Sequence, residues 1–148
     1  MSDIVYNPRT MKTDYTIISS YRNKDRVVEL VQALNDHEYS CYNFCDEPSD
    51  PKNPDAHPEE QMKVFEATKN FYDDPHFQKL FKRDLDGLRN ANVVILLQPC
   101  GLAAHMEAGI AFGLGKRSIM IGKPIKPETL YLMFSERFET IDDFLATI

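Results

Sequence analysis

The segment 92–97, "NVVILL", most constrains the fold, because it is a β-branched and leucine run without polar alternation. Such a run suits the centre of a parallel sheet, where helices cover both faces. Parallel strands also need crossover connections, which are usually helices. The segment therefore predicts an α/β fold with 92–97 as a central strand.

The rest of the chain alternates between strand-like and helix-like patterns. Further strands are expected at 14–19, 40–45, 117–122 and 137–140. Helices are expected at 25–37, 59–70, 76–89, 102–114, 127–134 and from 141 onward, and the proline-rich segment 46–58 reads as a loop. We therefore predict a three-layer, flavodoxin-like (Rossmann-like) domain with a five-stranded, mainly parallel sheet. The expected boundaries are an N-terminal arm over 1–13 and a single domain over 14–148.

Aromatic residues recur at roughly helical intervals between the two middle helices, and this spacing predicts that they are mostly core. They are Phe65, Phe71, Tyr72, Phe77 and Phe81.

Charge and composition exclude several classes of function. The net charge of −6 over 148 residues argues against binding to nucleic acid polymers or membrane surfaces, both of which need a basic face. No apolar run approaches the ~20 residues of a membrane span, and the N-terminus lacks a signal-peptide core, so a cytoplasmic protein is expected. The three cysteines have no zinc-like pairing and read as reduced, partly buried thiols, and no metal site is expected. Neither a phosphate-loop motif nor a dinucleotide fingerprint occurs, so no cofactor is expected.

A single carboxylate, Glu107, stands among small residues in "QPCGLAAHMEAGIAFGLGK", residues 98–116. In parallel sheets, ligands bind where the carboxyl ends of the strands lead into helices. Glu107 lies one to two turns into the expected helix, where the dipole and free N–H groups favour an ionised nucleophile or charge stabiliser. Gly101 and Ala104 are among the small residues that leave space for a ligand. The alternative is that these residues only permit close helix packing, with Glu107 in solvent.

Three segments of the second half resemble the nucleoside 2-deoxyribosyltransferase superfamily. They are "RDLDGLRNANVVILL" before and within the central strand, "GLAAHMEAGIAFGLGK" after it, and the tail "PETLYLMFSERFETIDDFLATI". The likeness covers roughly the last 65 residues, from Asp84 onward, and the first half matches in layout only. It supports the same three-layer fold.

The resemblance implies a glycosyl transfer through carboxylates. Glu107 matches the nucleophile that attacks the anomeric carbon, and Asp84 matches the acid that assists the leaving base. An oxocarbenium-like transition state needs a nearby anion, and departure of the base needs a proton, so the two carboxylates have complementary tasks. Asp84 can also be read as an ordinary helix-surface acid.

Several polar residues are candidate substrate ligands beside these two acids. Ser19, Ser20, Tyr21 and Arg22 follow the first strand and suit a ribosyl hydroxyl or a 5′-phosphate, although Arg22 can also be a solvated loop cation. His105 suits a sugar or phosphate contact, or is a packing histidine. Tyr131 stands near the position from which transferases supply an asparagine, often to a neighbouring subunit. This analogy implies a homodimer or higher homo-oligomer.

Three functions are compatible with the sequence. The first is cleavage or exchange of the N-glycosidic bond of a nucleoside or nucleoside 5′-monophosphate, with Glu107 as the nucleophile. The second is a non-catalytic nucleotide-binding or sensor module on the same fold. The third is a Toll/interleukin-receptor-like domain that cleaves NAD with a helix-borne glutamate. The sequence leaves open the choice of sugar, base, 5′-phosphate, and hydrolysis or transfer.

Overall fold

The computed structural model describes residues 12–148, which form one five-stranded, all-parallel sheet. The strands are β1 (Thr13–Ile18), β2 (Cys41–Tyr42), β3 (Ala91–Leu97), β4 (Arg117–Ile121) and β5 (Glu136–Phe138). Their order, β2-β1-β3-β4-β5, is that of flavodoxin-like folds. The predicted α/β, flavodoxin-like architecture is confirmed, and 92–97 lies in its central strand.

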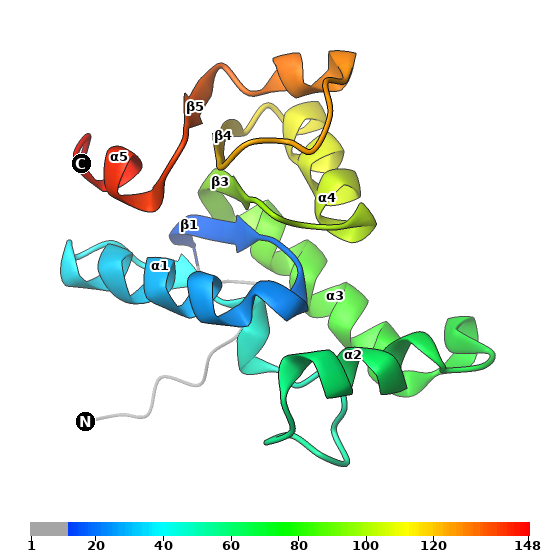
Figure 1. The fold of residues 1–148 in the computed structure, drawn as a ribbon. Coiled ribbons are helices and arrows are strands. Elements are labelled where there is room, and N and C mark those ends of the chain that lie inside the picture. The colour runs from blue at the N-terminus through cyan, green and yellow to red at the C-terminus, as the bar shows by residue number, and fades with distance from the viewer. Residues whose placement is uncertain (1–11) are drawn as a thin grey trace.

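Helices cover both faces of the sheet (Figure 1). On one face lie α1 (Lys24–Asp36) and α5 (Ile141–Leu145), and on the other α3 (Pro75–Asn90) and α4 (Leu102–Gly113). Successive residues of β3 point to opposite faces, so Ile95 and Leu97 pack with α1 while Val94 and Leu96 pack with α3 and α4. All four are fully buried, as a strand covered on both faces requires.

A fifth helix, α2 (Pro58–Glu66), lies outside these layers and packs against the short 3-10 helix η1 (Tyr21–Asn23) that follows β1 (Figure 1). Pro58 occupies the first turn of α2, and the His57 ring accepts a hydrogen bond from the backbone N–H of Glu59. The Tyr21 hydroxyl donates to Gln61 Oε1 at 3.1 Å, and both side chains are buried. α2 is thereby held over the carboxyl end of β1.

Two predicted boundaries differ from the structure. The strand expected at 40–45 pairs only over Cys41–Tyr42, because the Asn43 side chain accepts a hydrogen bond from the N–H of Cys45 and turns the chain into η2 (Phe44–Asp46). The arm expected over 1–13 ends too late, since Thr13 already pairs in β1. The arm's residues 1–11 lie outside the described part of the chain.

The prediction that the aromatic residues between α2 and α3 are mostly core is wrong. Phe71, Tyr72 and Phe81 are 46%, 82% and 67% exposed. Phe65 and Phe77 are half-buried and stack on one another, with ring centroids 4.2 Å apart. The physical reason is that α2, η3 (Phe71–Asp73) and the first half of α3 project past the sheet, where no second layer covers them (Figure 1).

One short helix lies between β4 and β5. The helix expected at 127–134 is the 3-10 helix η4 (Thr129–Met133), whose Tyr131 contacts His105 in the first half of α4. Among residues 12–148 no helix has both the length and the apolar character to span a bilayer.

Candidate active site

The site lies where the order of the strands reverses. Chain order runs outward from β1 to β2 on one side and through β3 to β5 on the other, so the carboxyl ends of β1 and β3 border a crevice typical of ligand sites. Ser19, directly after β1, donates from its hydroxyl to the Leu97 carbonyl at 2.8 Å. The Asn23 amide donates to the same hydroxyl at 3.2 Å. Ser19 therefore ties the ends of the two strands together.

The small residues of α4 have two separate effects. Ala104, Ala108 and Ala111 are buried and bring the helix close to the sheet. Ala104, predicted as a ligand contact, is only 1% exposed and belongs to this packing. A side chain at Gly101 or Gly109, by contrast, would meet nothing within 4 Å. The packing explanation therefore accounts for the alanines, whereas the two glycines border open space.

Glu107 is half-buried rather than fully exposed to solvent, as the packing explanation required. Burial of its carboxyl group and, to a smaller extent, the charge of Asp84 raise its pKa to about 8. No hydrogen bond from a described residue contributes to this shift. Glu107 is the sixth residue of α4, beyond the free N–H groups of the first turn, so the dipole does not compensate for burial. Burial therefore acts against the ionised state expected for Glu107, and that expectation stays a prediction.

Asp84 reaches the same region from α3, on which it precedes the buried Leu88 by one turn. Burial raises its pKa to about 6, although a hydrogen bond from Tyr42 and the charge of Arg83 act in the opposite direction. The structure thus places Asp84 and Glu107 within electrostatic reach of one another. Two like charges that share a poorly solvated site titrate as a pair, and the reading of Asp84 as a simple surface acid does not hold.

Burial disfavours ionisation of both carboxyl groups, and a charge on Asp84 disfavours ionisation of Glu107 further. Such a site favours the state in which one carboxyl group is ionised and the other keeps its proton. A carboxylate and a carboxylic acid in one site are what nucleophilic attack coupled to general acid catalysis requires.

His105 of α4 and Tyr131 of η4 form a second polar cluster, away from Glu107. His105 and Glu107 are two residues apart, so they project about 200° from one another around the helix. His105 Nδ1 lies 2.6 Å from the Gly101 carbonyl oxygen, which can only accept, so this nitrogen carries the proton. The Nε2 of His105 forms a hydrogen bond with the Tyr131 hydroxyl at 2.7 Å. The buried Gln98 amide donates to the same hydroxyl at 3.5 Å.

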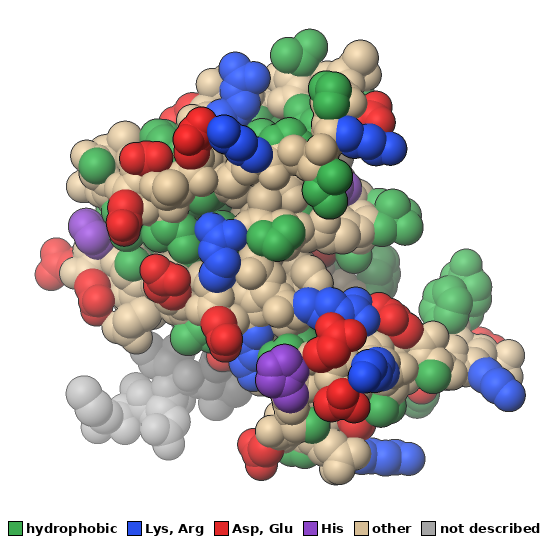
Figure 2. Space-filling view, in the orientation of Figure 1, with side chains coloured by type: hydrophobic (Ala, Val, Ile, Leu, Met, Phe, Trp, Pro, Cys, Tyr) green, Lys and Arg blue, Asp and Glu red, His purple; other side chains and the backbone are tan. Residues whose placement is uncertain are grey.

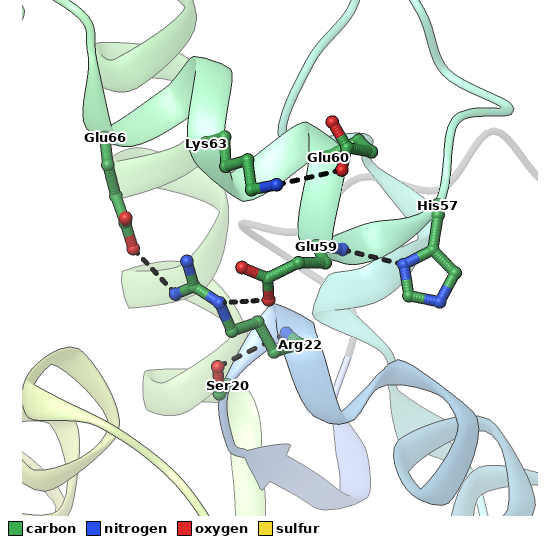
Figure 3. Close-up of polar contacts among 7 residues, drawn as sticks. All are labelled: Ser20, Arg22, His57, Glu59, Glu60, Lys63 and Glu66. Carbon is green, nitrogen blue, oxygen red and sulfur yellow. Dashed lines mark hydrogen bonds and ion pairs between the residues drawn. The ribbon is translucent and has the colours of Figure 1, made fainter.

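The remaining predicted ligands hold α2 in place. Arg22 donates from Nε to Glu59 at 2.7 Å and from its terminal nitrogen to Glu66 at 2.6 Å (Figure 3). The Ser20 hydroxyl accepts from the Arg22 backbone N–H at 3.2 Å. Arg22 lowers the pKa of both glutamates, so two carboxylates balance its charge. In this arrangement Arg22 is an exposed cation paired with two carboxylates rather than a free phosphate ligand, and the Tyr21 hydroxyl is engaged with Gln61.

The structure therefore divides the predicted site residues into three groups. Asp84 and Glu107 form one carboxyl pair, His105 and Tyr131 one hydrogen-bonded pair, and Ser20, Tyr21 and Arg22 one anchor for α2. Within residues 12–148 no cluster of histidine, cysteine or acidic side chains could hold a metal ion. Burial raises the pKa of Cys100 to about 12, so this thiol beside His105 is not a ready nucleophile.

Sequence reasoning missed Tyr42, which contacts Asp84, and Gly87, which lies against the Tyr42 ring. The Tyr42 hydroxyl donates to Asp84 Oδ1 at 3.0 Å. A Cβ at Gly87 would lie 2.5 Å from Cδ1 of the same ring. The only available signal was the spacing Asp84-x-x-Gly87, which places a carboxylate and an open position on one face of a helix.

Comparisons with known proteins agree with this geometry at the level of the fold. No protein-family model and no curated protein sequence matches the chain. Among solved structures, it is similar to a 2-deoxyribosyltransferase from the psychrotolerant bacterium Bacillus psychrosaccharolyticus. The two share 13% sequence identity with a TM-score of 0.61, over 89% of this chain and 90% of the other. The chain therefore has a nucleoside 2-deoxyribosyltransferase-like fold.

Proposed function

We propose that the protein cleaves or transfers the N-glycosidic bond of a nucleoside or nucleoside 5′-monophosphate, with Glu107 as nucleophile and Asp84 as general acid. The observation that carries this proposal is the coupled, poorly solvated carboxyl pair at the strand-reversal point of a deoxyribosyltransferase-like fold. Its ligand is accordingly a small nucleoside or nucleotide.

The reaction follows from the protonation of the pair. An ionised Glu107 oxygen forms a bond to the anomeric carbon, while the carbon–nitrogen bond breaks and its electron pair leaves with the base. A protonated Asp84 donates its proton to a nitrogen of the departing base. Water or a second base then attacks the glycosyl ester and restores the Glu107 carboxylate. Asp84 accepts the proton that the attacking group gives up.

The reaction needs the negative charge on Glu107 and the proton on Asp84, whereas burial and the charge of Asp84 disfavour ionisation of Glu107 in the free protein. Passage of a proton from Glu107 to Asp84 keeps one proton and one negative charge in the pair, so it requires no proton from solvent. Positive charge that develops on the sugar of a bound substrate favours the ionised form of Glu107. It thereby shifts the proton from Glu107 to Asp84, as the reaction requires.

The direct test is base release, followed by chromatography, from a panel of nucleosides, their 5′-monophosphates and NAD. We expect release by the wild type and none by Glu107→Ala, with both proteins folded by circular dichroism. Glu139→Gln is the matched control, because Glu139 is an exposed carboxylate that pairs only with the exposed Lys123 among the described residues. Release by Glu107→Ala at the wild-type rate would remove Glu107 from the mechanism.

A non-catalytic binding module is the second candidate, because burial and the charge of Asp84 disfavour the ionised form of Glu107 in the free protein. Under this alternative, calorimetry detects binding of a nucleoside or nucleotide while no base is released from any member of the panel. Release of nicotinamide from NAD alone would instead favour the NAD-cleaving function.

We also propose that the protein forms a homodimer or higher homo-oligomer through α4. Only His105 and Glu107 carry polar side chains among the twelve residues of α4, and a helix that is apolar on all sides is usually buried. Its outer face is nevertheless exposed, and hydrophobic side chains gather over η4 and α4 (Figure 2). The exposed residues are Leu102, Met106, Ile110, Phe112 and Leu114, continued by Leu130 and Leu132 of η4. A second copy covers such a self-complementary face.

A further inference from the structure

We propose that Tyr42 is a positioning residue for the proposed reaction: its hydroxyl engages Oδ1 of Asp84, and Gly87 leaves the space that its ring needs. This inference rests on the function proposed above, because it assigns a role within the same carboxyl pair. Tyr42 ends β2, Asp84 and Gly87 lie in the second half of α3, and Glu107 lies on α4. Three elements distant in sequence therefore converge on one carboxyl group.

The ring of Tyr42 is fixed by packing rather than by its hydroxyl alone. Tyr42 is 6% exposed, and its ring packs against α3 at Gly87, which has no side chain. A Cβ at that position would lie 2.5 Å from Cδ1 and 2.6 Å from Cε1 of the ring, closer than real contacts allow. Gly87 and Asp84 are three residues apart and so lie on the same face of α3. The glycine thus sets how closely the ring approaches the helix and how far its hydroxyl reaches.

The hydrogen bond also decides which oxygen of Asp84 can carry the proton. Tyr42 donates to Oδ1 at 3.0 Å, so a proton on Asp84 resides on Oδ2. Oδ2 is then the oxygen that exchanges a proton with Glu107 or with the leaving base. Without this hydrogen bond an aspartate can rotate about χ2 and present either oxygen to Glu107 or to the leaving base.

The other groups that face Asp84 do not replace this contact. Glu107 on α4 carries the like charge, and the neighbouring Arg83 pairs with Glu47. The Cys45 thiol faces Asp84 from η2 but keeps its proton, because burial raises its pKa to about 12. Tyr42 is the one described side chain that donates a hydrogen bond to Asp84 in this structure.

The test is a pH titration of the Asp84 and Glu107 carboxyl carbons by ¹³C NMR in the wild type and in Tyr42→Phe. Tyr42→Phe removes a hydrogen bond to the charged form of Asp84, so we expect the pKa of Asp84 to rise by about one unit. The two titration steps of the carboxyl pair then move closer together. Gly87→Ala, which displaces the ring but keeps the hydroxyl, moves the Asp84 step in the same direction. Tyr39→Phe is the matched control, because Tyr39 lies before β2, at the opposite end of the strand, and its titration curves should match the wild type.

Turnover supplies a second readout. We expect Tyr42→Phe to lower kcat by about tenfold with little change in KM, because it loosens a reacting group rather than a substrate contact. In this variant the acidic limb of the pH–rate profile shifts to higher pH by the same amount as the pKa of Asp84. A purely structural role would change stability and leave both pH dependences in place.

The possible failures are distinguishable. A folded Tyr42→Phe variant whose Asp84 titration equals that of the wild type overturns this inference, whether or not the protein is an enzyme. A wild-type protein that releases no base contradicts the proposed function, and in that case a shifted Asp84 titration still establishes that Tyr42 holds the carboxyl group.

Discussion

The Glu107 carboxyl group links function to stability, because its charge is the one that the folded protein disfavours most clearly. Burial and Asp84 raise its pKa from the ordinary value to about 8. A carboxyl group with a raised pKa binds protons more tightly in the folded than in the unfolded state, so its ionisation lowers the free energy of unfolding as pH rises from about 4.5 towards 8. The proposed nucleophile is therefore a source of instability at neutral and higher pH.

Because ionisation of Glu107 destabilises the folded protein, we can predict the effect of Glu107→Gln, which keeps the shape of the side chain and removes its charge. We expect the variant to unfold like the wild type at pH 5 and to be more stable by on the order of 2 kcal/mol at pH 9. Urea denaturation at both pH values measures the difference. Glu128→Gln, an exposed carboxylate on the chain before η4, should give no such pH-dependent gain. An equal gain at both pH values would contradict burial of the Glu107 charge.

At the scale of single elements, α4 combines a tightly packed inner face with an exposed outer one. Ala108 is 2% exposed and contacts the sheet, whereas Ala103 on the same helix is exposed. We predict that Ala108→Leu lowers the free energy of unfolding by about 1–3 kcal/mol, because added methyl groups have no space there. Ala103→Leu is the matched control and should change it by less than about 0.5 kcal/mol. Equal effects in urea denaturation would mean that the inner face is loosely packed.

The elements also show how far local sequence patterns determine this fold. The run at 92–97 and the helical periodicity around it predict the sheet and its main helices. A strand buried on two faces, and a helix buried along one stripe, each produce a recognisable pattern of hydrophobic residues in the local sequence. The strand expected at 40–45 is too long, because a hydrogen bond from the Cys45 N–H to the Asn43 side chain ends it early. The aromatics near Phe77 were assigned to the core because periodicity identifies a face but not whether another layer covers it. The Tyr42–Asp84 contact joins residues 42 positions apart and leaves no local trace.

At the scale of the whole molecule, the apolar outer face of α4 and η4 predicts the state of assembly. We expect light scattering after size exclusion to give a mass of at least twice the 17.1 kDa chain. Phe112→Glu should shift the protein towards monomer, because it places a charge among exposed apolar side chains. Val28→Glu, at another exposed hydrophobic position, on α1 at the other face of the sheet, is the control and should leave the mass unchanged. A wild-type monomer at micromolar concentration would contradict the proposal.

The two border strands of the sheet give this assembly a further constraint. β2 pairs over two residues and β5 over three, so the sheet ends on both sides in its shortest strands. Unpaired N–H and C=O groups along a border strand can template strand addition and fibrous aggregation, and short borders offer few of them. Copies of this chain that meet have little backbone with which to extend a common sheet. The proposed association is thereby directed to helix surfaces, where a two-fold contact closes on itself instead of propagating.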